Sequence, residues 1–275
     1  MTKQRLRSVA LVLSSVIALL TTCGESPARA IPPDPERPAR SAELVVFEAA
    51  SLREVFARLA GQFERDNPGV KVLMNAAGSQ ELRAQLEHGA AADVFASADR
   101  KHMDALAAQG LVVAPALFAC NQPVVVVRRG QAPPIRTFAD LPRVERLVVG
   151  APEVPIGAYT AQVLRRAAAI LGADFAAHVE ARVVSRELNV RQVLAKVTLG
   201  EADAGIVYRT DATSAGDKVQ VLAIPAEMNV LAEYPIAALA AAPHPELARR
   251  WLALVRSPAG VAVLREAGFV PCPTP

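Results

Sequence analysis

The chain has 275 residues, 52% of them hydrophobic and 21% charged, a composition that excludes a disordered protein and suits one large or two medium globular domains. The formal net charge of +3 matches the three cations Lys3, Arg5 and Arg7, so the chain beyond residue 23 is neutral. A neutral body lacks the basic face that binding to nucleic acid requires, which argues against a nucleic-acid partner.

The first 23 residues are predicted to be an export signal. Their cations precede an apolar run at residues 9–20, which is too short to cross a bilayer as a permanent helix. Two processing sites compete. The segment LTTC, ending at Cys23, is similar to the lipobox of bacterial lipoproteins, although Thr22 is larger than the residue usual there. The segment ARA, ending at Ala30, is a site for ordinary signal peptidase.

Residues 24–42 are predicted to form a tether, because they are rich in proline, charge and small side chains and show no hydrophobic periodicity. A tether favours lipid anchoring through Cys23 over cleavage after Ala30. Both routes give an exported protein, either periplasmic or anchored to a membrane. In such an oxidising compartment Cys120 and Cys272 are able to pair, provided that the fold brings their α-carbons within bridging distance.

From residue 43 onward, short runs of β-branched residues alternate with helical patterns. Strands are predicted at 44–47, 70–74 and 93–97, and the helices that follow them end near 65 or span 79–88 and about 100–109. This alternation is typical of βαβ units, in which helices cover both faces of a parallel sheet.

A second α/β set begins at residue 123. Its predicted elements are a strand at 123–130, a strand, loop and helix over 146–171, a helix at 190–199 and a strand that ends at Tyr208. Two more helices are expected over 245–269. Two sets of this size predict two lobes, and open α/β sheets bind ligands in the crevice beyond their strand ends.

Ser51 and Ser79 occupy equivalent positions in the first set. Each follows a strand, stands among small residues (EAAS and AAGS) and opens a helix. Ser51 also has the S-x-x-E spacing of a capping box with Glu54, so we expect its hydroxyl to cap the helix as well as to bind a ligand. A helix start carries free amide donors and about half a positive charge, so two such starts are able to converge on one anion.

Four ordered segments carry a resemblance to a known family. They are VVFEAASL, the run from AAGSQELR to KHMDAL, VVGAPEVPIGAYTAQVL and NVRQVLAKVTLGEADAGIVY. Together they resemble the molybdate-binding proteins of molybdenum ABC importers, which are type II periplasmic binding proteins. The resemblance implies an α/β fold of two lobes, each a mainly parallel sheet flanked by helices, with a ligand cleft between them. The first lobe is then expected at 43–121 plus 238–275, and the second at 122–237.

The resemblance also implies a binding site for one tetrahedral dianion. The binding serines of the family match Ser51 and Ser79, its backbone amides match Ile156 and Val190, and its tyrosine hydroxyl matches Tyr208. All these donors are neutral and are expected to contact the oxygens of the ion, with no direct ligand to the metal. Hydrogen bonds to a charged acceptor are about twice as strong as neutral ones, so such a set is able to hold a dianion.

Three positions depart from the pattern of the family. Glu48 stands where a small residue is usual, and its carboxylate would repel a dianion if it faced the cleft, although strand alternation lets it point elsewhere. Ile156 is bulkier than usual, which matters little for a backbone amide. Asn189 replaces an acid that often precedes the matching valine.

The predicted function is capture of molybdate or tungstate by a monomeric exported receptor that delivers the ion to an ABC permease, with no cofactor. A receptor for another small oxyanion, such as sulfate or phosphate, is the alternative, and an adhesion or interaction lipoprotein is a third class. An enzyme is not expected, because a serine hydrolase needs a G-x-S-x-G elbow and a histidine base, and no motif supplies either. No histidine has a second His or Cys at zinc-site spacing, so no zinc site is expected.

Overall fold

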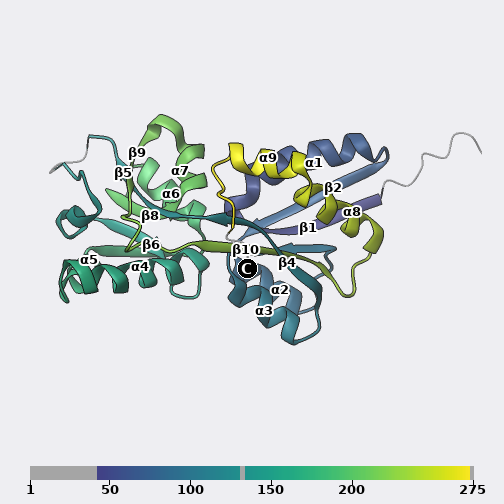
Figure 1. Ribbon diagram of the computed structural model, residues 1–275, viewed down its shortest axis with the longest axis horizontal. Coiled ribbons are helices and arrows are strands. Elements are labelled where there is room, and N and C mark those ends of the chain that lie inside the picture. The colour runs from purple at the N-terminus through teal and green to yellow at the C-terminus, as the bar shows by residue number, and fades with distance from the viewer. Residues whose placement is uncertain (1–41, 131–133, 273–275) are drawn as a thin grey trace, which may run out of the picture. The chain divides into compact units, whose positions relative to one another are not determined.

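The computed structural model of the protein describes residues 42–130 and 134–272 (Figure 1). The predicted export signal at 1–23, the processing sites at Cys23 and Ala30, and the tether up to residue 41 lie outside the described residues. Ala42, which we assigned to the tether, already belongs to the first strand.

The first sheet is built mainly from the N-terminal part of the chain. Its five strands, in spatial order, are β2 (Val70–Ala77), β1 (Ala42–Ala49), β3 (Val94–Ala96), β10 (Ala232–Leu239) and β4 (Val112–Asn121). Helices α1 (Arg53–Asp66), α8 (Pro245–Arg256) and α9 (Pro258–Glu266) cover one face, and α2 (Ser79–Glu87) and α3 (Arg100–Ala108) cover the other (Figure 1). A short 3-10 turn, η1 (Ala50–Leu52), joins β1 to α1.

The second sheet has the same size. Its strands, in spatial order, are β7 (Val183–Glu187), β6 (Leu147–Gly150), β8 (Ala204–Tyr208), β5 (Pro123–Arg128) and β9 (Val219–Ala223). Helices α6 (Val190–Thr198) and α7 (Arg209–Ala215) lie on one side of it, and α4 (Pro155–Leu171) and α5 (Phe175–Glu180) lie on the other (Figure 1). The 3-10 turns η2 (Phe138–Arg143) and η3 (Gly216–Lys218) complete the connections.

Both sheets are mixed. β1 runs parallel to β2 and β3, whereas β10 runs antiparallel to β3 and β4. In the second sheet β6 runs parallel to β7 and β8, whereas β5 runs antiparallel to β8 and β9. The antiparallel strands β5 and β10 are those that follow the two crossings of the chain between the sheets, so they enter their sheets without a helical βαβ crossover, which parallel pairing requires.

The return crossing lies earlier than the sequence suggested. We expected residues 232–237 in the second lobe, but β10 pairs along its length with strands of the first sheet. By sheet membership the chain crosses to the second lobe next to Gln122, between β4 and β5, and returns in the segment 224–231, between β9 and β10.

The predicted apolar stripe of α1 forms part of the core. Val55, Leu59 and Phe63 are buried at one-turn spacings, as the helical period requires. Trp251 of α8 is fully buried and meets the rings of Phe56 and Phe63 edge to face, at centroid distances of 5.4 and 5.6 Å. Burial of each such side chain stabilises the fold by roughly 1.5–3 kcal/mol. These contacts fix α1, and with it the turn at its start.

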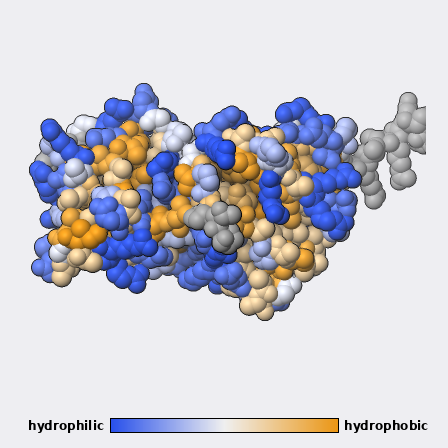
Figure 2. All heavy atoms as spheres, viewed as in Figure 1, coloured by the Kyte–Doolittle hydropathy of each residue, from blue (hydrophilic) through white to orange (hydrophobic). Residues whose placement is uncertain are grey.

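The surface is mostly polar on the face shown in Figure 2, with apolar side chains in smaller groups. Within the described residues, no helix has the length and apolar character needed to span a bilayer.

Cys120, at the end of β4, forms a disulfide with Cys272, and their α-carbons are 5.2 Å apart. The backbone of Cys120 also pairs with that of Val270 through two hydrogen bonds. The disulfide therefore fastens the C-terminal segment beside the point where the chain leaves the first lobe. The sequence alone did not show whether Cys120 and Cys272 pair, and the structure shows that they do. Disulfides of this kind persist in an oxidising compartment.

Candidate functional site

A small hollow lies where turns of the two lobes meet. The first lobe contributes the turns that follow β1, β2 and β3, and the second contributes the turns before α4 and α6 and the end of β8. The residues that line it are Ala49, Ala50, Ser51, Ala77, Gly78, Ser79, Ala98, Val154, Pro155, Ile156, Asn189, Val190 and Tyr208. The structure thus brings all five residues that the sequence singled out around one hollow.

Small residues allow the backbone turns to approach each other. Gly78 has ordinary backbone angles, with φ at −64°, but a Cβ atom there would overlap the carbonyl oxygen of Leu188 in the other lobe. Gly157, in the first turn of α4, stands against the backbone of Ala151, where a Cβ would also overlap. Gly78 thus permits the two lobes to approach each other, and Gly157 permits close packing within the second lobe.

The predicted capping role of Ser51 is wrong. Leu52 is the N-cap of α1, and no side chain of the described residues caps this helix. The hydroxyl of Ser51 instead lies 2.9 Å from the hydroxyl of Tyr234 on β10, and both side chains are buried. Ser51 lies within the short turn η1, before the N-cap of α1. The sequence spacing of a capping box is therefore present, but Ser51 is not at the position from which it could cap the helix.

Ser79 is the first residue of α2, and Gly78 is its N-cap. The carboxylate of Glu81 accepts a hydrogen bond from the amide of Gly78 at 3.1 Å. The hydroxyl oxygen of Ser79 accepts a bond from the amide of Ala98 at 3.0 Å. This bond leaves the hydroxyl hydrogen of Ser79 to donate, and it ties the turns after β2 and β3 together.

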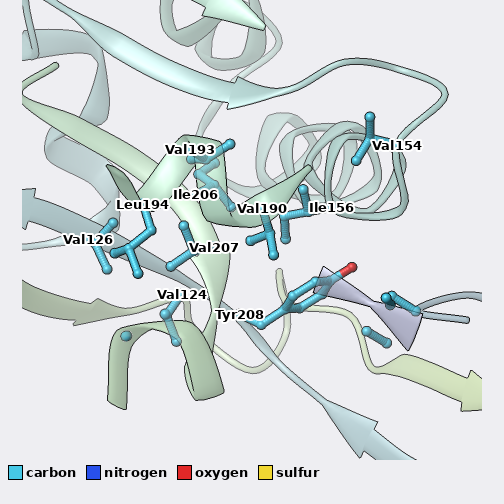
Figure 3. Close-up of a cluster of buried hydrophobic side chains, with 14 of the residues drawn as sticks. Val124, Val126, Val154, Ile156, Val190, Val193, Leu194, Ile206, Val207 and Tyr208 are labelled. Carbon is cyan, nitrogen blue, oxygen red and sulfur yellow. The ribbon is translucent and has the colours of Figure 1, made fainter. Parts of the chain in front are cut away.

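Ile156 and Val190 offer backbone amides at helix starts. Ile156 is the second residue of α4, after Pro155, and Val190 is the first residue of α6. An amide at these positions has no acceptor within its own helix. Asn189 caps α6 by accepting bonds from the amides of Arg191 and Gln192 but not from that of Val190. The side chains of Ile156 and Val190 lie close to the ring of Tyr208 (Figure 3).

Tyr208 ends β8 and carries an unusual hydroxyl. Its side chain is 1% exposed, and within the described part of the chain the hydroxyl has no hydrogen-bond partner. The ring packs edge to face against Tyr159 and Tyr234, and the hydroxyl points away from the neighbouring valines (Figure 3). Burial, the larger cause, and nearby tyrosines raise the pKa of Tyr208 well above its usual value, so the group remains a donor. A buried hydroxyl without a partner costs about 1–3 kcal/mol, which indicates a position kept for a ligand.

Glu48 does not line the hollow. Its side chain is fully buried on the face of β1 that also carries Leu44 and Val46, opposite to the face of Ala49. Burial raises the pKa of Glu48 to about 8, against the opposing effect of Arg53, so the carboxyl is neutral at pH 7. Glu48 therefore places no negative charge in the hollow, and its departure from the family pattern does not oppose an anion site.

Hydrogen bonds across the cleft surround the hollow. The side-chain amide of Gln80 donates to the carbonyl of Leu188 at 2.7 Å, and the Nε2 atom of His102 lies 3.0 Å from the carbonyl oxygen of Glu153. On a third side, Arg191 of α6 pairs with Glu54 of α1. Each contact joins one lobe to the other, so the two lobes are closed around the hollow.

Comparison with known proteins assigns the family. The model of the bacterial extracellular solute-binding proteins matches residues 44–270. This chain belongs to that family. The family consists of binding proteins, which confirms the expectation that the chain is not an enzyme. Membership of this extracellular family also agrees with the expectation that the protein is exported.

This solute-binding protein is similar to molybdate-binding proteins. It is 41% identical over 264 residues to the molybdate-binding protein ModA of Mycobacterium tuberculosis (strain ATCC 25618 / H37Rv), an alignment that covers 95% of this chain and 97% of the relative. The substrate-binding domain of a putative molybdenum ABC transporter from Clostridium difficile is 28% identical, with a TM-score of 0.64 over 85% of this chain and 100% of that one.

The predicted two-lobe fold is confirmed by a solved structure. The periplasmic molybdate-binding protein of Azotobacter vinelandii has a TM-score of 0.73, with 22% identity over 84% of this chain and 100% of that one.

Sequence reasoning missed three residues of this solute-binding protein that shape the site. Tyr234 contacts Ser51, Gly78 permits the approach of Leu188, and Arg191 spans the cleft. Gly78 and Arg191 lie inside segments that carried the family resemblance, but nothing local shows which distant residues they meet. Tyr234 lies in a strand that the sequence analysis did not predict.

Proposed function

We propose that this protein captures one molybdate or tungstate ion between its lobes and presents it to an ABC permease in the membrane. The donors are the hydroxyls of Ser51, Ser79 and Tyr208 and the backbone amides of Ile156 and Val190. No chemistry occurs on the ion. Closure of the cleft and binding are linked, because donors from both lobes reach one ion together only when the lobes approach each other.

The observation that carries this proposal is the buried hydroxyl of Tyr208, which has no partner among the described residues and lies beside two helix starts and two serines in one hollow. Fixed neutral donors suit an ion that stays doubly negative at neutral pH, since bonds to a charged acceptor are the stronger ones. The identity of 41% to a molybdate-binding protein supports the choice of ion.

Selectivity follows from the same donors. A protonated phosphate would turn a hydroxyl towards another donor, which costs about 1–3 kcal/mol. Sulfate has the shape and charge of molybdate but is smaller, so its oxygens would lie too far from several donors at once. The hydrogen bond from Gln80 to the carbonyl of Leu188, and the close approach of Gly78 to the same carbonyl, set the distance between the lobes. This distance sets the size of the hollow.

The receptor is proposed to act as a monomer, either free in the periplasm or anchored by a lipid on Cys23. The membership of an extracellular family supports export, and one relative, YvgL of Bacillus subtilis, is described as a putative substrate-binding lipoprotein. Mass spectrometry of the native protein tests the anchor. An acylated Cys23 supports it, and a chain that begins at Ile31 contradicts it.

Isothermal titration calorimetry of residues 42–275 with molybdate, tungstate, sulfate and phosphate tests the ligand. We expect tight binding of the first two ions only. Equal affinity for sulfate would remove the size argument and favour the receptor for a smaller oxyanion. Binding of none of the four would refute the proposed function.

Alanine at Ser51 or at Ser79 should then weaken molybdate binding by about 1–3 kcal/mol, because the ion loses one donor in a dry site. Thermal unfolding of the same variants checks that the fold survives. Ser257→Ala is the matched control: its hydroxyl caps α9 by accepting from the amide of Gly260 and does not line the hollow. That variant should lose stability and keep its affinity.

A further inference from the structure

Arg191 is placed to connect the binding turns. It is the second residue of α6, directly after Val190, and its side chain is 19% exposed. It does not line the hollow itself. Its guanidinium nevertheless has partners in both lobes, and these partners lie in the turn that carries Ser51 or in the helices that directly follow Ser51 and Tyr208.

Two partners lie in the first lobe. The Nε atom donates to the carbonyl of Ala50 at 3.3 Å, and the Nη2 atom pairs with the carboxylate of Glu54. Ala50 begins η1 and immediately precedes Ser51. A bond to this carbonyl therefore holds the backbone that carries the first binding serine.

Two further partners lie in the second lobe. The Nε atom lies 2.9 Å from Oδ1 of Asp211, and Nη1 donates to the hydroxyl of Ser214 at 2.8 Å. Asp211 is fully buried, and its other oxygen accepts a bond from the amide of Tyr208 at 3.2 Å. Arg191 is thus one step from Tyr208 through a carboxylate that fixes the end of β8.

The side chain needs to be arginine. The planar guanidinium presents five donors in fixed directions, whereas the single ammonium of lysine is a compact charge that cannot reach widely separated acceptors together. The buried carboxylate of Asp211 also needs a cation, because an unpaired buried charge is strongly destabilising. Arginine meets both requirements from one helix position.

We infer that Arg191 is a positioning residue that holds the Ser51 turn, the Val190 amide and the Tyr208 hydroxyl in one arrangement when the cleft closes. The inference rests on the proposed function and adds a residue that does not touch the ion. The two first-lobe bonds form only when the lobes are together, so they stabilise the closed state. Their loss should speed ligand release more than it slows association.

Arg191→Lys tests the inference without leaving Asp211 unpaired. We expect molybdate to bind about tenfold more weakly, with most of the change in the dissociation rate, measured by stopped-flow chase with tungstate. Arg186→Lys is the matched control, because Arg186 pairs with Glu180 at the surface of the same lobe and, within the described residues, has no partner in the first lobe. It should bind as the unchanged protein does.

Hydrogen exchange followed by mass spectrometry gives a second readout that does not depend on the identity of the ligand. Arg191→Lys should speed exchange in peptides that contain residues 50–54, in the other lobe, and Arg186→Lys should not. An unchanged dissociation rate together with unchanged exchange there would overturn the inference, as would a loss of thermal stability alone. If the unchanged protein binds no oxyanion, the proposed function fails, and the exchange comparison still decides the role of Arg191.

Discussion

The hydroxyls of Ser51 and Tyr234 lie 2.9 Å apart, across 183 residues of sequence, and both side chains are buried. Either hydroxyl is able to donate in this pair. When Tyr234 donates, Ser51 accepts, and the hydroxyl hydrogen of Ser51 is free to point elsewhere and to bind an anion.

Tyr234→Phe should therefore weaken molybdate binding by about 1 kcal/mol, since the direction of the Ser51 hydroxyl is no longer fixed. The ring packing against Phe118, Tyr208 and Phe269 is kept. Calorimetry on a double-mutant cycle with Ser51→Ala measures the effect. If Tyr234 acts through Ser51, the phenylalanine should change nothing further once the serine is absent. Additive losses in the double variant would show that Tyr234 acts by another route.

Gly78→Ala should weaken binding while the protein stays folded. The backbone angles of Gly78 suit alanine, but its Cβ would overlap the carbonyl of Leu188 across the cleft, so the lobes are held apart. Relief of such an overlap costs about 1–3 kcal/mol, which we expect to appear as lost affinity. Small-angle scattering with saturating molybdate should show a more open protein.

Gly61→Ala is the control for this variant. Gly61 lies within α1, and the nearest atom to an added Cβ is at the flexible end of Arg65, 3.6 Å away. Alanine there should stabilise the helix by up to about 1 kcal/mol and leave affinity unchanged. If Gly78→Ala binds molybdate with unchanged affinity and closes as the unchanged protein does, Gly78 is not needed for the approach of the two lobes.

Local periodicity predicted the elements from β1 to α3 and the placing of Ser51 and Ser79 after neighbouring strands. It did so because each strand and its helix are adjacent in the sequence and bury an apolar face. β10 was not predicted, since it pairs with strands more than a hundred residues earlier. The capping interpretation of Ser51 failed for the same reason: a partner 183 residues away overrode the local motif. The contact of Arg191 with Ala50, over 141 residues, is equally invisible in one segment.

Removal of the disulfide should lower stability. Replacing both Cys120 and Cys272 by serine should reduce the free energy of unfolding by about 2–5 kcal/mol, because the crosslink closes a loop of 152 residues. Denaturant titration of the double variant, compared with the oxidised and reduced forms of the unchanged protein, measures this change. The reduced protein should match the double variant. Equal stability of all three forms would contradict the prediction.

Glu48 should make stability fall as pH rises. Burial raises its pKa to about 8 in the folded protein, whereas the unfolded chain releases the proton near 4.5. Between these values the folded state holds a proton that the unfolded state has lost, so stability decreases from about pH 4.5 to about pH 8 and then levels off. Neither carboxylate oxygen has a hydrogen-bond partner in the described residues, and the charge of Arg53 opposes the effect of burial only in part.

Glu48→Gln isolates this effect, because glutamine has nearly the same shape and no charge. The variant should match the unchanged protein below about pH 4.5 and be more stable at pH 8, by an amount on the order of a few kcal/mol. Denaturant titrations at several pH values compare the two slopes. Above pH 8 the ionised Glu48, three residues before Ser51, should also reduce the affinity of the unchanged protein for a dianion relative to that of the variant. A slope that persists in Glu48→Gln would mean that another group carries the pH dependence.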